Sequence, residues 1–145
     1  MAEFNGRARR ALALPLFVIL VFSACAAVAT VPERPIFSQV GVASWYGPDF
    51  QGQTTANGER FNMQAMTAAH RSLPFGTIVR VTDLDSGRVV KVRINDRGPL
   101  VAGRVLDLSK NAARRLGIAD DGTAEVRLQV FASDQTAGSA GVSEQ

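Results

Sequence analysis

Three residues of this 145-residue chain carry side chains suited to proton transfer, namely Glu59, His70 and Asp96. Asp96 is the first carboxylate after an alternating apolar segment, and a turn-rich Arg-Gly-Pro stretch follows it. A carboxylate at such a position can act as a general acid or base. It can equally form an Asx turn that holds the loop. The local sequence leaves both interpretations of Asp96 open.

Glu59 and His70 have structural interpretations as well. Glu59 directly follows an Asn57-Gly58 turn, where an exposed glutamate is common. His70 is the only histidine and lies among small and apolar residues, a setting typical of a histidine with a structural hydrogen-bonding role. Since the chain has one histidine and one cysteine, without the spacing of metal ligands, we expect neither a metal site nor a cofactor.

A further carboxylate, Asp107, comes two residues before Ser109. Ser109 is a favourable N-cap for a helix over Lys110–Leu116, and Gly117 is a favourable residue to end it. Asp107 could reach the site, but its place before the cap favours a residue that stabilises the loop and the start of this helix. A second short helical turn is predicted near Met63–Met66.

Alternating and β-branched segments dominate the part of the chain that must position these side chains. They cover Val40–Ser44, Ile78–Thr82, Val90–Ile94 and Ala124–Val130, of which the middle two are predicted to form a hairpin. Short strands, long loops and few helices indicate a mainly β fold, a small closed or partly closed barrel with one or two short helices. The longest irregular stretches, Gly47–Asn62 and Asn95–Gly103, contain Glu59 and Asp96. Loops on a rigid barrel are the expected place for a functional site.

Residues 1–29 have the three-part organisation of a secretory signal, with arginines, a short apolar run and then small residues. The run is shorter than the roughly 20 residues that a membrane-spanning helix needs. Cys25, the only cysteine, ends the segment Phe22–Cys25, which resembles a bacterial lipobox except that Phe22 stands where leucine is preferred. We therefore expect lipid attachment at Cys25. Ordinary cleavage after Ala29 is the alternative.

The rest of the chain divides into three parts. Residues 30–39, with two prolines, are predicted to be a linker; residues 40–131 to be the folded domain; and residues 132–145, rich in Ser, Gly, Ala and Gln, to be a disordered tail. The formal charge is +3, but removal of the signal leaves 13 basic and 12 acidic residues. A nearly neutral mature chain argues against nucleic acid as a partner.

Four motifs in order resemble the rare lipoprotein A family. They are GVASWYG at Gly41–Gly47, TANGE at Thr55–Glu59, LPFGT at Leu73–Thr77 and RINDRGP at Arg93–Pro99. The resemblance extends over Gly41–Val130, essentially the whole predicted domain. It implies a double-psi β-barrel of six strands in an envelope protein.

The resemblance also implies an activity, the lytic transglycosylase cleavage of peptidoglycan glycan strands, with peptide-free strands as the typical substrate. By motif match, Asp96, Glu59 and His70 fall on the family's functional positions, with Asp96 as general acid and then base. The residues expected to contact substrate are Trp45, Tyr46, Phe50, Asn57, Asn95 and Arg97. Trp45, as a tryptophan in a strand, fits the core equally well.

Two other functions share such a barrel, so the fold alone does not choose among them. One is a non-catalytic, expansin-like module that binds or loosens the wall. The other is a true hydrolase with Glu59 and Asp96 as paired carboxylates. We expect a monomer that is exported to the cell envelope, lies in the periplasm, and is held to a membrane by lipid at Cys25.

The chain departs from the family pattern in two places. Residues 132–145 are too few for the C-terminal module that binds septal peptidoglycan in many members, which puts division-site targeting in doubt. Asn62 occupies a place where the family commonly has aspartate, so a second acidic contact near Phe61 is expected to be missing.

Overall fold

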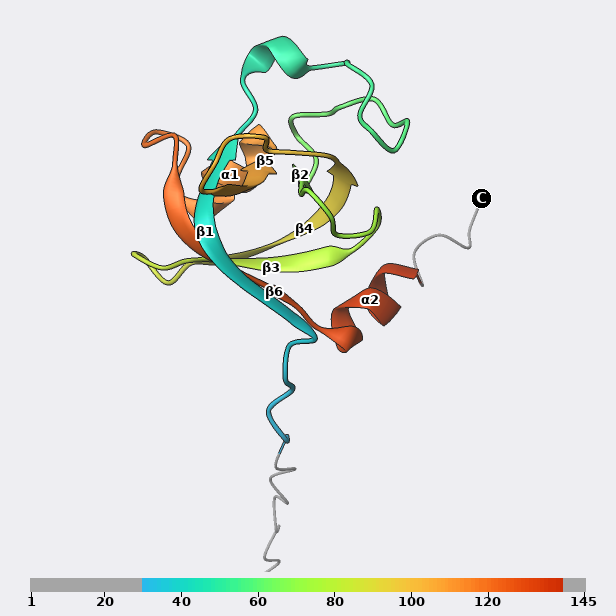
Figure 1. Cartoon of the computed structure of the whole chain (residues 1–145), viewed down its shortest axis with the longest axis vertical. Helices are drawn as coiled ribbons and strands as arrows, with labels where there is room; N and C mark the ends of the chain where they lie inside the picture. Colours follow the sequence, from blue (N-terminus) through green and yellow to red (C-terminus); the bar gives the residue numbers. More distant parts are fainter. Residues whose placement is uncertain (1–29, 140–145) are drawn as a thin grey trace, which may run out of the picture. The chain divides into compact units, whose positions relative to one another are not determined.

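A computed structural model describes residues 30–139 of the chain (Figure 1). Its elements are, in order, β1 (Phe37–Trp45), the 3-10 helix η1 (Pro48–Phe50), β2 (Thr67–Ala69), β3 (Ile78–Asp83), β4 (Val89–Asp96), β5 (Arg104–Leu108), α1 (Lys110–Leu116), β6 (Ala124–Val130) and α2 (Ala132–Ser139). The predicted secretory signal and Cys25 lie outside the described residues. Within them, no helix is long and apolar enough to cross a membrane.

The six strands close into a barrel in the order β1-β5-β2-β4-β3-β6. Two neighbouring pairs, β1 with β5 and β2 with β4, are parallel, and the remaining four pairs are antiparallel. The hairpin of β3 and β4 pairs Val81 with Val90, as the alternating sequence predicts. The prediction of a six-stranded double-psi β-barrel is confirmed. Closure leaves no long strand edge unpaired, which a small all-β domain needs.

The barrel interior is filled by the inward-facing residues of these alternating strands. Every second residue of β3 and β4 is buried, including Val79, Val81, Val92 and Ile94, and β6 adds Val126 and Leu128. Their outward neighbours are mainly charged or polar. Buried and solvent-facing residues alternate along these strands because one face of the sheet packs on the core and the other faces solvent.

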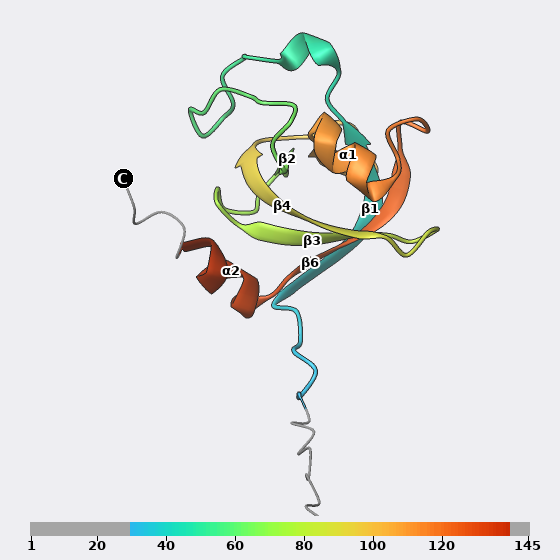
Figure 2. The ribbon, with the colours of Figure 1, turned by 180° about the vertical axis from the view of Figure 1, so that it is seen from behind.

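Helix α1 begins and ends where the sequence predicts. The Ser109 hydroxyl accepts a hydrogen bond from the backbone N–H of Ala112, and Gly117 adopts a left-handed conformation with φ of 87°. The helix buries Ala112, Ala113 and Leu116 against the barrel (Figure 2). By contrast, the helical turn predicted at Met63–Met66 is wrong, because these residues form turns and bends before β2.

The C-terminal segment differs from its prediction as a disordered tail, because Ala132–Ser139 form α2. Composition predicts disorder there, but Asp134, only 6% exposed, forms ion pairs with Arg80 at 2.6 Å and Lys91 at 2.7 Å. The Gln135 side chain adds hydrogen bonds to the backbone of Ile78. These partners lie more than 40 residues away, so composition does not reveal them.

The folded unit also begins earlier than predicted, since β1 starts at Phe37, within the expected linker. Phe37 pairs with Val130, the last residue of β6. Next to this pair, Glu33 accepts hydrogen bonds from the backbone N–H and the hydroxyl of Ser133. The chain therefore enters and leaves the barrel at one end, whereas the loop after β1 arches over the other end (Figure 1).

Candidate active site

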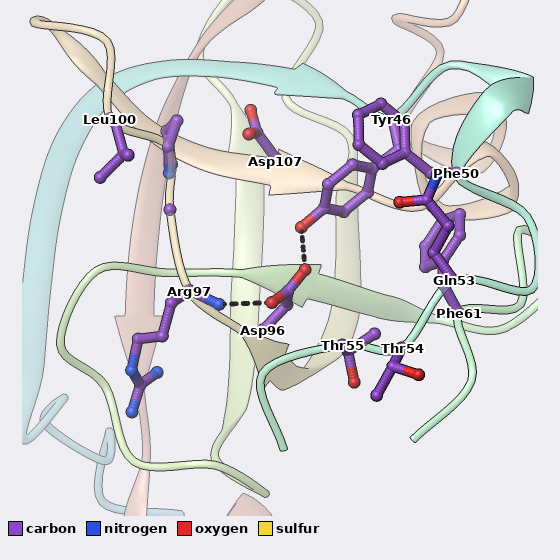
Figure 3. Close-up of a pocket in the computed structure, with 12 residues that line it drawn as sticks. Tyr46, Phe50, Gln53, Thr54, Thr55, Phe61, Asp96, Arg97, Leu100 and Asp107 are labelled. Atoms are coloured by element: carbon purple, nitrogen blue, oxygen red, sulfur yellow. Dashed lines mark hydrogen bonds between the residues drawn. The ribbon is translucent and has the colours of Figure 1, made fainter. Parts of the chain in front are cut away.

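A pocket of about 320 Å³ opens at the end of the barrel where β1 and β4 finish (Figure 3). Tyr46 directly follows β1, and Asp96 is the last residue of β4. Phe50 and Phe61 come from the loop over this end, and Leu100 comes from the loop after β4. The two loops singled out in the sequence therefore do meet at one site, which has an apolar rim around a carboxylate.

Asp96 is held in this pocket by three hydrogen bonds from neutral donors. The Tyr46 hydroxyl donates to Oδ2 at 2.8 Å, and the backbone N–H groups of Ala56 and Arg97 each donate to Oδ1 at 2.9 Å. The contacts come from three separate segments, so the carboxylate is fixed in orientation. Fixed orientation toward a cavity is what a group that exchanges a proton with a bound ligand needs.

Tyr46 is a hydrogen-bond donor that stays neutral. Burial raises the pKa of the Tyr46 phenol well above its ordinary value, and the hydrogen bond to Asp96 and the charges of Asp96 and Asp107 raise it further. Its ring contacts Phe50 and Phe61, with centroid distances of 5.2 and 4.8 Å. Phe50 is 44% exposed, so this aromatic cluster offers a face to ligand.

Glu59 does not line the pocket but anchors the turn beside it. Arg93 donates to both of its oxygens, at 2.7 and 2.9 Å, and the side-chain amides of Asn57 and Asn95 donate as well. The ion pair with Arg93 is the main reason that the pKa of Glu59 falls to about 2. Glu59 is thus ionised at neutral pH. It holds the turn whose Ala56 N–H reaches Asp96.

His70 lies outside the lining of the Asp96 pocket. Its Nδ1 accepts from the backbone N–H groups of Ser72 and Leu73, so Nε2 carries the proton and donates to Gln39 at 3.0 Å. Burial, followed by the charges of Arg97 and Arg71, lowers the pKa of His70 below its usual value. His70 meets Asp96 only through the backbone, where its N–H donates to the Asp96 carbonyl.

The six predicted substrate contacts fall into two groups. Tyr46, Phe50 and Arg97 line the pocket, although the Arg97 guanidinium lies over the Phe75 ring and donates to backbone carbonyls. Trp45, Asn57 and Asn95 do not line it: Trp45 packs against the core, and both amides bind Glu59. The structure thus joins only part of the predicted site around Asp96.

The model of a family described as lytic transglycolase matches residues 38–128. The chain belongs to this family. The resemblance noted in the sequence motifs is thereby confirmed.

Two relatives carry the name endolytic peptidoglycan transglycosylase RlpA, in one case preceded by "probable". The Synechocystis protein so qualified is 62% identical over 90 residues, which are 62% of this chain and 28% of that protein. The Campylobacter jejuni protein is 56% identical over 91 residues, 63% of this chain and 33% of that protein. The chain thus spans about a third of the length of these relatives.

A solved structure extends the likeness beyond the family. It is an aspartate-to-asparagine mutant of the Clavibacter michiganensis expansin in complex with cellohexaose. Its sequence is 26% identical, and the TM-score is 0.51 over 66% of this chain and 50% of that one.

Several residues that line the pocket were not among the predicted site residues, including Phe61, Leu100 and Asp107, the last of which the sequence favoured as a helix-start residue. The structure places Asp107 on β5 and in the wall of the pocket, with hydrogen bonds from Ser44 and Arg104. The signal that could have found it is the β-branched and leucine-rich stretch Arg104–Leu108, which was not recognised as a strand. Within residues 30–139, no cluster of three or more His, Cys, Asp or Glu is arranged to hold a metal ion.

Proposed function

We propose that this domain is an endolytic lytic transglycosylase that cleaves peptidoglycan glycan strands, preferably strands without peptides, and leaves 1,6-anhydro ends. The observation that carries the proposal is Asp96, a carboxylate oriented by three neutral donors at the wall of a pocket with an aromatic rim. The family and the names of the two relatives support the same reaction.

One acid/base residue is enough for this reaction. Asp96 in its acid form donates a proton to the glycosidic oxygen as the bond from that oxygen to the anomeric carbon breaks. The 6-hydroxyl of the same sugar then bonds to the anomeric carbon and returns its proton to the Asp96 carboxylate. The products are a free 4-hydroxyl on one strand and a 1,6-anhydro ring on the other. Water takes no part, so a second carboxylate to activate it is not required.

Glu59 and His70 support this step as positioning residues. The ion pair of Glu59 with Arg93 leaves it without a proton to give at neutral pH. Its contribution is the turn that presents the Ala56 N–H to Asp96. His70 holds the segment after β2 through its ring and contacts the end of β4 through its N–H. Loss of either residue is expected to misplace Asp96.

The test is product analysis by mass spectrometry after the purified protein has been incubated with peptide-free glycan strands. The proposal expects fragments with anhydro ends. Fragments with ordinary reducing ends would identify a hydrolase. An absence of fragments from a protein that still sediments with peptidoglycan would refute the enzyme.

A non-catalytic wall-binding module is the second candidate. The observation in its favour is the similarity to an expansin whose structure was solved with cellohexaose. Under this hypothesis Phe50 and Tyr46 would contact sugar rings, and Asp96 would accept a hydrogen bond from a sugar hydroxyl. Binding would then survive Asp96→Asn with little loss, and no bond would be cleaved by either protein.

We further propose that the chain is exported to the cell envelope, in the periplasm, after a signal peptide at residues 1–29. Lipid on Cys25 would hold the domain near a membrane. A mass measurement of the mature N-terminus distinguishes a lipidated Cys25 from cleavage after Ala29. The domain is proposed to act as a monomer, without a cofactor and without nucleic acid, and sedimentation analysis measures the oligomeric state.

A further inference from the structure

The strand register places two aspartates symmetrically at the pocket end of the barrel. Strand β2 lies between β4 and β5, and its last residue, Ala69, pairs with Asp96 on one side and with Asp107 on the other. Since neighbouring strands lie about 4.8 Å apart, the two aspartates are two strand spacings, roughly 10 Å, apart at the backbone. Both residues line the pocket. Carboxylates that act together on a glycosidic bond have carboxyl groups about 5–10 Å apart, and a backbone spacing of roughly 10 Å is compatible with that range.

The Asp107 carboxylate is fixed at one oxygen and open at the other. Ser44 and Arg104 both donate to Oδ1, each at 2.5 Å. Among residues 30–139, no hydrogen bond of this carboxylate ends on Oδ2. The Asp107 side chain is 15% exposed and the residue lines the pocket, so its carboxylate is only partly hydrated.

Tyr46 interacts with both aspartates, by a hydrogen bond with one and through the charge of the other. Its hydroxyl donates to Asp96, and the charge of Asp107 also acts on it. In the view of Figure 3, the hydroxyl lies between the two carboxylates. A ligand that binds Asp96 in this pocket is therefore also exposed to the negative charge of Asp107.

The reaction proposed above needs a negative charge that is not the proton donor. As the glycosidic bond breaks, positive charge develops on the anomeric carbon and the ring oxygen, and a fixed anion in a partly buried site stabilises it. Glu59 is unsuited to this task because Arg93 and the two amides occupy both of its oxygens and it lies outside the pocket lining. Asp107 lines the pocket, and although Ser44 and Arg104 occupy its Oδ1, its Oδ2 has no hydrogen-bond partner among residues 30–139.

We propose that Asp107 is a second catalytic carboxylate, which contacts the reacting sugar through Oδ2 and stabilises its positive charge while Asp96 transfers the proton. No covalent bond to Asp107 forms. Ser44 and Arg104 are its positioning residues. The inference rests on the proposed transglycosylase function. It adds the residue that stabilises the positive charge on the reacting sugar.

The test compares kcat and KM for anhydro-end formation in the wild-type chain and in Asp107→Asn. Asparagine keeps the size of the side chain and removes its charge, and we expect kcat to fall by about 10²- to 10³-fold. Sedimentation with peptidoglycan should stay within about threefold, because ground-state binding does not need the charge. The matched control is Asp120→Asn, an exposed carboxylate outside the pocket, with unchanged kcat.

Further variants distinguish a catalytic role of Asp107 from a purely structural one. Asp107→Asn leaves the Arg104 guanidinium without its anion, which by itself lowers stability. The double variant Asp107→Asn/Arg104→Gln removes both charges, so its thermal midpoint should return toward that of the wild type while kcat stays low. Asp107→Glu keeps the ion pair and displaces the carboxylate, and it should lose kcat with a nearly unchanged midpoint.

Three results would overturn parts of this scheme. Recovery of kcat in the double variant, or kcat within threefold of wild type in Asp107→Asn or Asp107→Glu, would refute the role of Asp107 alone. A wild-type chain that forms no anhydro ends would refute the proposed function and the inference with it. The wild-type measurement therefore distinguishes the two failures.

Discussion

The two ends of the barrel each hold a fixed aspartate, and their partners differ in kind. At the α2 end, Asp134 is paired with two cations, Arg80 and Lys91. At the pocket end, the three hydrogen bonds to Asp96 come from a phenol and two backbone amides, all neutral. An aspartate between two cations is tied to both and joins two parts of the structure, whereas the hydrogen bonds to Asp96 involve no cation, so no ion pair is broken when its side chain takes up a proton. The contrast between Asp134 and Asp96 therefore lies in their partners. Asp107 stands between the two cases, because Arg104 pairs with one of its oxygens and the other has no hydrogen-bond partner among residues 30–139.

The sharpest test of this contrast is Asp96→Asn. We expect cleavage to fall by about 10³-fold or more, because the residue that donates and recovers the proton is gone. The thermal midpoint should change little, since asparagine can retain most of the hydrogen bonds. Product formation from peptide-free strands and circular dichroism provide the two measurements. Full activity in this variant would remove Asp96 from its role.

The neutral donors of Asp96 can be tested through Tyr46→Phe. The substitution keeps the ring contacts with Phe50 and Phe61 and removes one hydrogen bond to the carboxylate. A hydrogen bond to a charged group contributes about 1.5–3 kcal/mol, so a loss of kcat of roughly 10- to 100-fold is expected. Steady-state kinetics should assign the loss to kcat. A change confined to KM would instead indicate that Tyr46 only binds sugar.

Asp134→Asn should show the opposite result, a loss of stability without a loss of activity. We expect the free energy of unfolding to fall by about 1–2 kcal/mol, a modest value because Arg80 and Lys91 are partly exposed. Urea titration measures the change, and Asp85→Asn at an exposed position is the matched control. If Asp134→Asn abolished cleavage in a folded protein, the contrast between the two ends would fail.

The same comparison predicts a pH dependence. The ion pair with Arg80, followed by that with Lys91, lowers the pKa of Asp134 from 3.8 to about 2. A carboxylate with a lowered folded-state pKa stabilises the protein above its unfolded value and loses that contribution as the pH falls. Wild type should therefore lose stability between about pH 4 and pH 2, and Asp134→Asn should lose less over this range. Equal acid unfolding of both proteins would contradict the assignment.

The smallest effect is expected at the rim of the pocket. Phe50→Ala removes a half-exposed aromatic face, and KM should rise by about 3- to 10-fold with kcat retained. Val89→Ala, at an exposed apolar residue outside the pocket, is the control and should leave KM unchanged. If kcat fell as much as in Tyr46→Phe, Phe50 would instead be a residue that helps to orient Asp96, and not one that only binds substrate.

Local patterns predicted most of the barrel, because alternation and capping depend on residues near one another in the chain. The hairpin of β3 and β4 and the limits of α1 follow from such patterns. The site was less predictable. The motif match found Asp96 but could not tell that Glu59 would be occupied by Arg93, 34 residues away. Asp107 and the partners of Asp134 were missed for the same reason, since pairing across strands depends on the closed topology.

The position of Glu33 against Ser133 has a practical consequence. Both chain ends leave the barrel beside the Phe37–Val130 pair, and the nine residues of β1 carry the backbone from there to Tyr46, a path of about 30 Å. A linker, a tag or a surface joined on the N-terminal side therefore approaches the barrel from the end opposite Tyr46 and Asp96. Copies of the domain immobilised on that side should keep the pocket at the other end open to solvent.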